Sequence, residues 1–194
     1  MVDSVKELTV DLHDYPEHAK IFRRTAVRGI VARGGRYLFV HSRRYGDCKF
    51  PGGGMEQHET HADTLIREVR EETGYDVLPE SVGACICVHE RRRGLYGDLL
   101  CMDSYYYFCA VGDAVHPQKL DAYERDEGYE VRWLTLAEAA AYNEAALQND
   151  RTTWVQRERA VLQYLAENCD GHREADRFCR RKTASNPEAL EIHL

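Results

Sequence analysis

The sequence has no apolar run close to the roughly 18 residues that a membrane-spanning helix needs. Its first ten residues, MVDSVKELTV, lack the basic stretch and apolar core of a secretory signal. These two absences lead us to expect a cytoplasmic protein with no membrane partner. The 194 residues contain no internal repeat and no low-complexity linker, so we also expect one principal domain.

Clustered metal-binding cysteines are missing as well. The seven cysteines form no CxxC pair, and the nine histidines do not gather around them. Cys85, Cys87 and Cys109 lie in apolar, strand-like runs, which indicates thiols packed as small hydrophobic side chains. We therefore predict no zinc site.

Excess positive charge is the third absence. The net charge of −7 excludes binding of nucleic acid through bulk electrostatics. Any anionic ligand would have to be held by a few local cations or by metal ions.

The spacing of apolar residues predicts a mixture of strands and helices. We expect strands at 24–31 and 36–41, joined by a turn at Gly34-Gly35, and further strands at 82–90, 104–111 and 130–134. We expect helices at 60–73, 136–142 and 152–167, and a polar connection at 91–94. Strands and helices without regular βαβ alternation favour an α+β fold.

Three segments follow from this pattern. Residues 1–23 are interpreted as an N-terminal arm, and residues 24–145 as the main domain. Residues 146–194 are interpreted as a C-terminal helix and a charged tail, packed on the same domain or trailing from it.

Glu68, Glu71 and Glu72 share one face of the predicted helix at 60–73, because they are related by i, i+3 and i+4. Like charges at this spacing destabilise an isolated helix, and glutamates in the last turn oppose the helix dipole. Gly74 lies where a C-cap glycine would end this helix. An unfavourable cluster of this kind is better explained if a cation occupies it than as a solvated acidic surface.

Mg²⁺ prefers oxygen ligands and keeps several waters and substrate phosphate oxygens. Three carboxylates facing a glycine-rich loop would hold such an ion, which would neutralise phosphate charge and acidify a bound water. A carboxylate not fully engaged by the metal could take the proton from the attacking water. The residues therefore predict metal-dependent hydrolysis of a phosphate anhydride.

Residues 53–75, GGMEQHETHADTLIREVREETGY, resemble the signature of the Nudix hydrolase family. The signature has a glycine, a glutamate, an Arg-Glu pair followed by an apolar residue, a Glu-Glu pair, and a second glycine followed by an apolar residue. All of these stand at fixed spacing. These places are filled here by Gly53, Glu59, Arg67, Glu68, Val69, Glu71, Glu72, Gly74 and Tyr75. Only Tyr75 departs from the usual aliphatic residue.

The resemblance implies an α/β/α sandwich with a mixed β-sheet between helices, and the activity of a pyrophosphohydrolase. It implies Mg²⁺ or Mn²⁺ ligation by Glu68, Glu71 and Glu72, with the Gly53 carbonyl as a further ligand. It also implies that Glu71 or Glu72 contacts the attacking water during catalysis. Three residues that support the loop and helix around them are Glu59, Arg67 and Gly74.

Cations near the glycine loop are candidates for binding substrate phosphates, and these are Arg43, Arg44, Lys49 and, more remotely, Arg92. Glu127 and Glu130 are alternative candidates for the general base, because some family members use a glutamate in this region. For each of these residues, a solvated surface role is the competing interpretation.

The signature does not encode what is attached to the diphosphate. Glu90 stands where ADP-ribose enzymes often have a proline, so the resemblance leaves the leaving group open. We expect a nucleotide or nucleoside-diphosphate derivative as the small-molecule partner, and a homodimer is an option. Two alternatives are a non-catalytic nucleotide-binding or sensor module and an isoprenoid-diphosphate isomerase, whose additional cysteine motif is missing.

Overall fold

Two strands at the centre of the main sheet, β2 (Ile21–Arg33) and β3 (Arg36–Ser42), contain runs of consecutive buried residues. Successive side chains on a strand point to opposite faces. Val31 and Leu38 join one buried cluster, whereas their neighbours Ile30 and Phe39 join the other. A sheet with two buried faces needs cover on both sides.

The computed structural model describes residues 5–94, 97–148 and 153–168. The main sheet has the order β1-β7-β8-β2-β3-β10, with β4 paired to β3 and β5 paired to β2. Its other strands are β1 (Lys6–Asp11), β4 (Cys48–Lys49), β5 (Gly52–Gly54), β7 (Cys85–Arg93), β8 (Leu99–Cys109) and β10 (Tyr129–Leu134). The β1–β7 and β2–β8 pairs are parallel and the remaining pairs are antiparallel, so the sheet is mixed.

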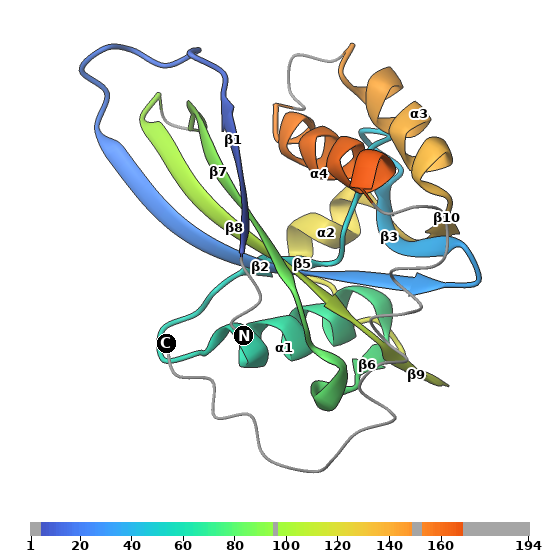
Figure 1. Ribbon diagram of the computed structural model, residues 1–194. Coiled ribbons are helices and arrows are strands. Elements are labelled where there is room, and N and C mark those ends of the chain that lie inside the picture. Colours follow the sequence, from blue (N-terminus) through green and yellow to red (C-terminus); the bar gives the residue numbers. More distant parts are fainter. Residues whose placement is uncertain (1–4, 95–96, 149–152, 169–194) are drawn as a thin grey trace.

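Helices cover the two faces of this sheet (Figure 1). On one face lies α1 (His61–Thr73), whose Leu65 and Val69 pack against Val27 and Val31 of β2. On the other face lie α3 (Leu136–Ala146) and α4 (Val155–Asn168). The short helix α2 (Ala122–Glu127) precedes β10. This is the α/β/α sandwich that the sequence predicts.

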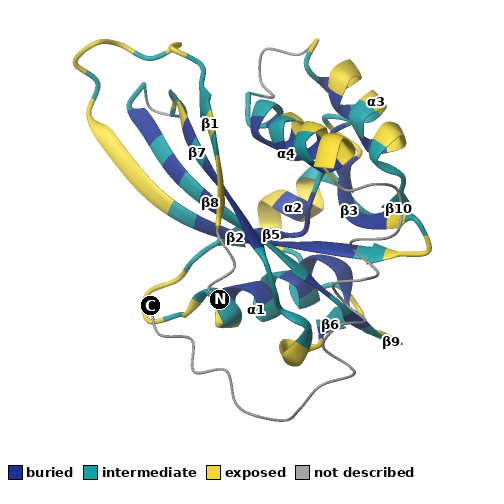
Figure 2. Ribbon diagram, viewed as in Figure 1, coloured by how far each residue is buried: buried dark blue, intermediate teal, exposed yellow. Residues whose placement is uncertain are grey.

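A small second sheet and one helical turn complete the described structure. The sheet pairs β6 (Tyr75–Val77) with β9 (Val111–Val115), and the turn is η1 (Pro79–Ser81). Burial is concentrated where β2, β7 and β8 pass between the helices, and the first residues of β2 are exposed (Figure 2).

Several predicted elements are confirmed with their end signals. Thr60 caps α1 together with Asp63, and Thr135 caps α3 together with Glu138. Gly74 ends α1 in the left-handed conformation, with φ of 77°. Cys48, Cys85 and Cys87 are buried free thiols, as expected.

One expectation is wrong. The polar connection expected at 91–94 is largely strand, because Arg91–Arg93 extend β7 by pairing with residues 99–101 of β8. The expected N-terminal arm contains β1, which pairs in parallel with β7 and so belongs to the main sheet. The charged tail at 169–194 lies outside the described residues. In the described part of the chain, no helix is long and apolar enough to cross a membrane.

Candidate active site

The glutamate-bearing helix α1 is fixed to the sheet by its apolar face. Leu65 and Val69 are fully buried against β2, and this orientation turns the side of the helix that bears Glu68 and Glu72 toward the glycine strand β5. Glu72 is itself buried, with 1% of its surface exposed, so the face that the three glutamates share is not a uniformly solvated surface. Glu71 is the most exposed of the three, with 38% of its side chain accessible.

The glycine strand touches two of these carboxylates. Gly52 has φ of 142°, a conformation suited to glycine, and its N–H donates to Glu72 Oε2 at 2.7 Å. A Cβ atom on Gly53 would lie 2.6 Å from the Cδ and both carboxylate oxygens of Glu68. Glycine at these two positions allows the backbone to approach both glutamates.

Arg67 joins the start of the signature to its helix. Its guanidinium makes a bidentate pair with Glu59, with Nε···Oε1 at 2.6 Å and Nη2···Oε2 at 2.9 Å. It also donates to Gly54 O at 3.2 Å, to Glu68 at 2.8 Å and to Glu71 at 3.3 Å. The hydrogen bonds from Arg67 lower the pKa of Glu59 to about 2. These contacts support the predicted bracing role of Glu59 and Arg67.

Burial makes the negative charge of this cluster costly. It raises the pKa of Glu72 to about 7, against the opposing effects of Lys49 and the Gly52 N–H. Burial also raises the pKa of Glu68, opposed by the hydrogen bond from Arg67. Lys49 Nζ lies 3.5 Å from Glu72 Oε1 and 4.1 Å from the ring centroid of Tyr129. The site therefore contains more buried carboxylate than its own cations neutralise.

A fourth carboxylate, Glu124 on α2, was not predicted from the sequence. Its side chain is 5% exposed, and its charge raises the pKa of both Glu68 and Glu72. It accepts hydrogen bonds from the Asp121 N–H at 2.8 Å and the Tyr123 hydroxyl at 2.9 Å. A capping-box spacing from Asp121 to Glu124 is the only signal in the sequence that could have indicated a helix here.

The other predicted residues near the loop have different surroundings. Arg43 is mostly exposed and lies 3.4 Å from Glu130, which also pairs with Arg132 at 3.0 Å. The hydrogen bond from Arg132 lowers the pKa of Glu130, whereas burial raises the pKa of Glu127 despite nearby Lys49. The structure therefore brings Lys49 to Glu72, places Glu127 within electrostatic reach of Lys49, and directs Glu130 toward arginines.

Arg44 and Arg92 show no arrangement for a shared phosphate site. The guanidinium of Arg44 lies 5.4 Å from the ring centroid of Tyr45. Arg92 Nε pairs at 2.8 Å with Glu90, which is buried in the sheet, and only 13% of the Arg92 side chain is exposed. Its surroundings favour an internal ion pair over the predicted substrate contact.

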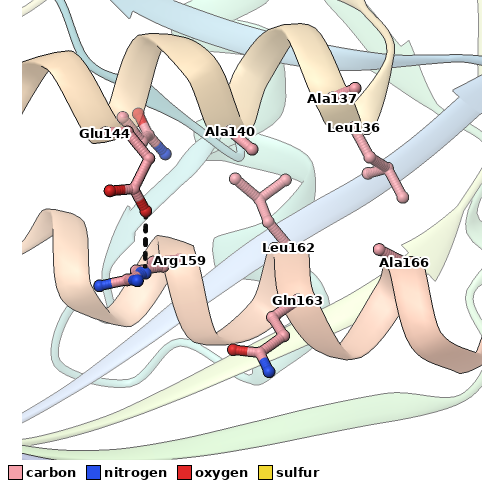
Figure 3. Close-up of a pocket in the computed structure, with 9 residues that line it drawn as sticks. Leu136, Ala137, Ala140, Glu144, Arg159, Leu162, Gln163 and Ala166 are labelled. Carbon is pink, nitrogen blue, oxygen red and sulfur yellow. Dashed lines mark ion pairs between the residues drawn. The ribbon is translucent and has the colours of Figure 1, made fainter.

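The described residues form a separate shallow groove between α3 and α4 (Figure 3). Leu136, Ala140, Leu162 and Ala166 line it, and an ion pair between Glu144 and Arg159, at 3.0 Å, crosses it. Its lining contains one carboxylate beside one arginine, so it offers no acidic cluster comparable with that on α1.

Comparison with known proteins agrees with the signature. The family described as the NUDIX domain matches residues 22–157, well over half of the chain. No curated protein is similar enough to the chain to count as a match.

Among the similar solved structures, the first has a TM-score above 0.5 and shares the fold at low sequence identity. A Nudix hydrolase from Nitrosomonas europaea has a TM-score of 0.51 and 21% identity, covering 75% of this chain and 90% of that chain. A MutT Nudix hydrolase from Burkholderia pseudomallei has a TM-score of 0.45 and 17% identity, covering 60% and 85%. An ADP-ribose pyrophosphatase from Streptococcus suis has a TM-score of 0.39 and 18% identity, covering 59% and 75%.

Proposed function

Since the chain belongs to the NUDIX domain family, we propose that it hydrolyses the diphosphate linkage of a nucleoside diphosphate joined to another group. The observation that carries this proposal is the contact between the glycine strand and the glutamates. Gly52 donates to Glu72, and Gly53 leaves room for the Glu68 carboxylate. Gly53, Glu68 and Glu72 occupy positions of the family signature, and Gly52 directly precedes it.

Glu68, Glu71 and Glu72 are the proposed ligands of a divalent cation, Mg²⁺ or Mn²⁺, with the Gly53 carbonyl as a further donor. When bound, such an ion would neutralise phosphate charge and lower the pKa of a coordinated water. The fit rests on the raised pKa of Glu68 and Glu72, because buried carboxylates in excess of local cations favour an added positive charge.

In the described part of the chain, no three histidine, cysteine or acidic side chains form a ready-made metal cage. Mg²⁺ sites usually include waters and substrate phosphate oxygens among their ligands, so the proposed glutamates need not form a complete cage before substrate binds. Glu124 is a fourth acidic group that we assign to the same site, because its charge acts on both Glu68 and Glu72.

We assign proton transfer from the attacking water to Glu71 or Glu72, and Glu127 is the better supported of the two alternative bases. Glu71 is accessible to a water from solvent. Burial raises the pKa of Glu127 toward the range of a useful base, whereas Arg132 holds the pKa of Glu130 low. Lys49 is the cation best located to contact a substrate phosphate.

The proposal also covers the partners of the enzyme and its location. We expect a small nucleotide derivative as substrate, a cytoplasmic location and no nucleic-acid partner, and the homodimer stays open. The competing function is a binding or sensor module without catalysis. The intact carboxylate cluster favours hydrolysis, because a sensor would gain nothing from burying these charges.

A panel of nucleoside triphosphates, nucleotide sugars, ADP-ribose and dinucleoside polyphosphates tests this function. The expected result is product formation that requires Mg²⁺ or Mn²⁺ and falls at least about 100-fold in Glu72→Gln. The matched control is Glu80→Gln, a change at an exposed glutamate on η1. Absence of turnover with every substrate would favour the sensor, and full activity in Glu71→Gln and Glu72→Gln would refute the assigned site.

A further inference from the structure

Two adjacent charged residues of α4 lie in the interior, far along the chain from the signature. Arg157 is 2% exposed and Glu158 is fully buried. Arg157 donates to Glu90 at 2.8 Å and to Glu158 at 3.0 Å. The Tyr106 hydroxyl donates to Glu158 Oε1 at 2.8 Å and accepts from Arg157 Nε at 2.9 Å. These residues form one connected polar network inside the sandwich.

Burying such charges is costly, and apolar residues of similar volume would often be equally stable. The network nevertheless keeps Glu158 in its charged form. Burial raises the pKa of Glu158, but the positive charges of Arg157 and Arg28 outweigh this and hold it below the ordinary value. A retained, fully buried carboxylate suggests a local task in addition to packing.

Glu158 contacts the segment that leads into the glycine strand β5. Glu158 Oε2 accepts from the Phe50 N–H at 3.2 Å, and Arg28 Nε lies 3.8 Å from Glu158 Oε1. The same Arg28 donates through Nη1 to the carbonyls of Phe50, at 3.1 Å, and Gly52, at 2.8 Å. Residues 50–52 are therefore held on both their donor and their acceptor side by a buried ion pair.

The same segment also contacts the active-site helix α1. The Gly52 N–H donates to Glu72 Oε2 at 2.7 Å. A continuous set of contacts thus runs from Glu158 on α4, through Phe50 and Gly52, to the most buried glutamate of the signature.

We propose that Glu158 is a positioning residue, which fixes the Glu72 carboxylate for metal binding by holding residues 50–52. This role rests on the proposed function, because it presumes that Glu72 binds a metal ion. Glu158 acts through the backbone of the segment and touches neither substrate nor metal.

The change Glu158→Gln tests the role with little change in volume. Both oxygens of Glu158 accept, one from Phe50 and the other from Tyr106 and Arg157. A glutamine has one acceptor oxygen and turns an NH₂ donor toward one of these donors. Either the Phe50 N–H, or the Tyr106 hydroxyl and the Arg157 Nη2 group, then loses its acceptor on residue 158.

Three readouts on the full-length protein separate positioning from general stability. Mn²⁺ binding is measured by electron paramagnetic resonance, and exchange of the Gly52 amide is measured by NMR. Steady-state kinetics on a substrate that the nucleotide panel identifies supply kcat and KM separately. Tyr106→Phe is a milder variant that removes only the hydroxyl contact, and Val161→Ala, in the buried core on the same helix, is the control for destabilisation.

In Glu158→Gln we expect Mn²⁺ affinity to fall about 10-fold, as for other residues that orient metal ligands. Gly52 exchange should become faster, and kcat should fall more than KM changes. Tyr106→Phe should weaken Mn²⁺ binding by about threefold. Val161→Ala should leave Mn²⁺ affinity unchanged while lowering the melting temperature.

Two results would overturn the inference, and they differ in what else they refute. Wild-type Mn²⁺ affinity and Gly52 exchange in folded Glu158→Gln and Tyr106→Phe would refute the positioning role alone. If Glu72→Gln binds Mn²⁺ as well as the wild type does, then the proposed metal site fails, and the positioning role fails with it.

Discussion

Gly53 can approach the Glu68 carboxylate closely because it has no side chain. A methyl group at Gly53 would occupy the place of the Glu68 carboxylate. That carboxylate is the end of a flexible side chain, so it can turn away at a small cost to the fold. The residue is thus needed for the geometry of the site more than for stability.

We therefore predict that Gly53→Ala loses Mn²⁺ affinity and activity by about 10- to 100-fold, a range typical of disturbed metal ligands. The melting temperature in EDTA should change little. Gly112→Ala is the matched control, because its added Cβ would meet no atom closer than 4.0 Å. Activity of Gly53→Ala equal to that of Gly112→Ala would contradict the assignment of Glu68 as a ligand.

Some site residues could be predicted from the sequence and others could not. Glu68 and Glu72 share a helix, so regular 3.6-residue spacing brings them together. Glu124 reaches the same place from another helix about 50 residues later, through long-range packing that a local pattern does not encode. Glu127 and Glu130 are the candidates that the sequence indicates in this region, and the burial that favours Glu127 over Glu130 is visible only in the folded chain.

At the scale of elements, Arg67 holds α1 to the loop that precedes it. Lysine would keep the charge but could not make the bidentate contact with Glu59 or reach Gly54 O at the same time. We predict that Arg67→Lys lowers the free energy of unfolding by about 1–3 kcal/mol and lowers kcat. Urea denaturation and steady-state kinetics measure the two effects.

Arg70→Lys is the control for this change, because Arg70 lies on the same helix and pairs with Asp76 outside the loop. It should retain activity close to that of the wild type. Equal stability and activity in Arg67→Lys would refute the bracing role.

The elements that the sequence predicted well are those with local end signals. α1 and α3 each begin at a capping threonine, and α1 ends at a left-handed glycine. β1 has no comparable signal, because its half-polar residues become a strand only by pairing with β7 about 80 residues later. In α4, Arg157 and Glu158 would be expected on a solvated face, and partners supplied by β2, β7 and β8 make their burial tolerable.

At the scale of the whole molecule, elements outside the signature support the sheet on which the signature helix α1 packs. β1 extends the sheet beside β7, and α4 packs against the opposite face from α1. Glu90 stands where ADP-ribose enzymes often have a proline, and here it pairs internally with Arg157 and Arg92. That position is used here for the interior of the fold, so it gives no indication of the substrate.

The stability of the whole protein should depend on pH through the buried Glu72. Its folded-state pKa, about 7, lies above the ordinary value of 4.5, so the folded chain binds this proton more tightly than the unfolded chain does. The resulting stabilisation is complete below about pH 4.5 and is lost as the pH rises through about 7. In EDTA, the melting temperature of the wild type relative to Glu72→Gln should therefore fall by roughly 5–10 °C between pH 5 and pH 8.

Divalent cations should reverse this loss, because they bind the ionised form of Glu72 and not its protonated form. We predict that saturating Mg²⁺ raises the wild-type melting temperature by more at pH 8 than at pH 5.5, and that Glu72→Gln loses most of this difference. Thermal unfolding followed by circular dichroism, with Glu80→Gln as the control, measures both effects. A shift that is the same at the two pH values, or one that persists in Glu72→Gln, would mean that Mg²⁺ stabilises the fold from a place other than this glutamate cluster.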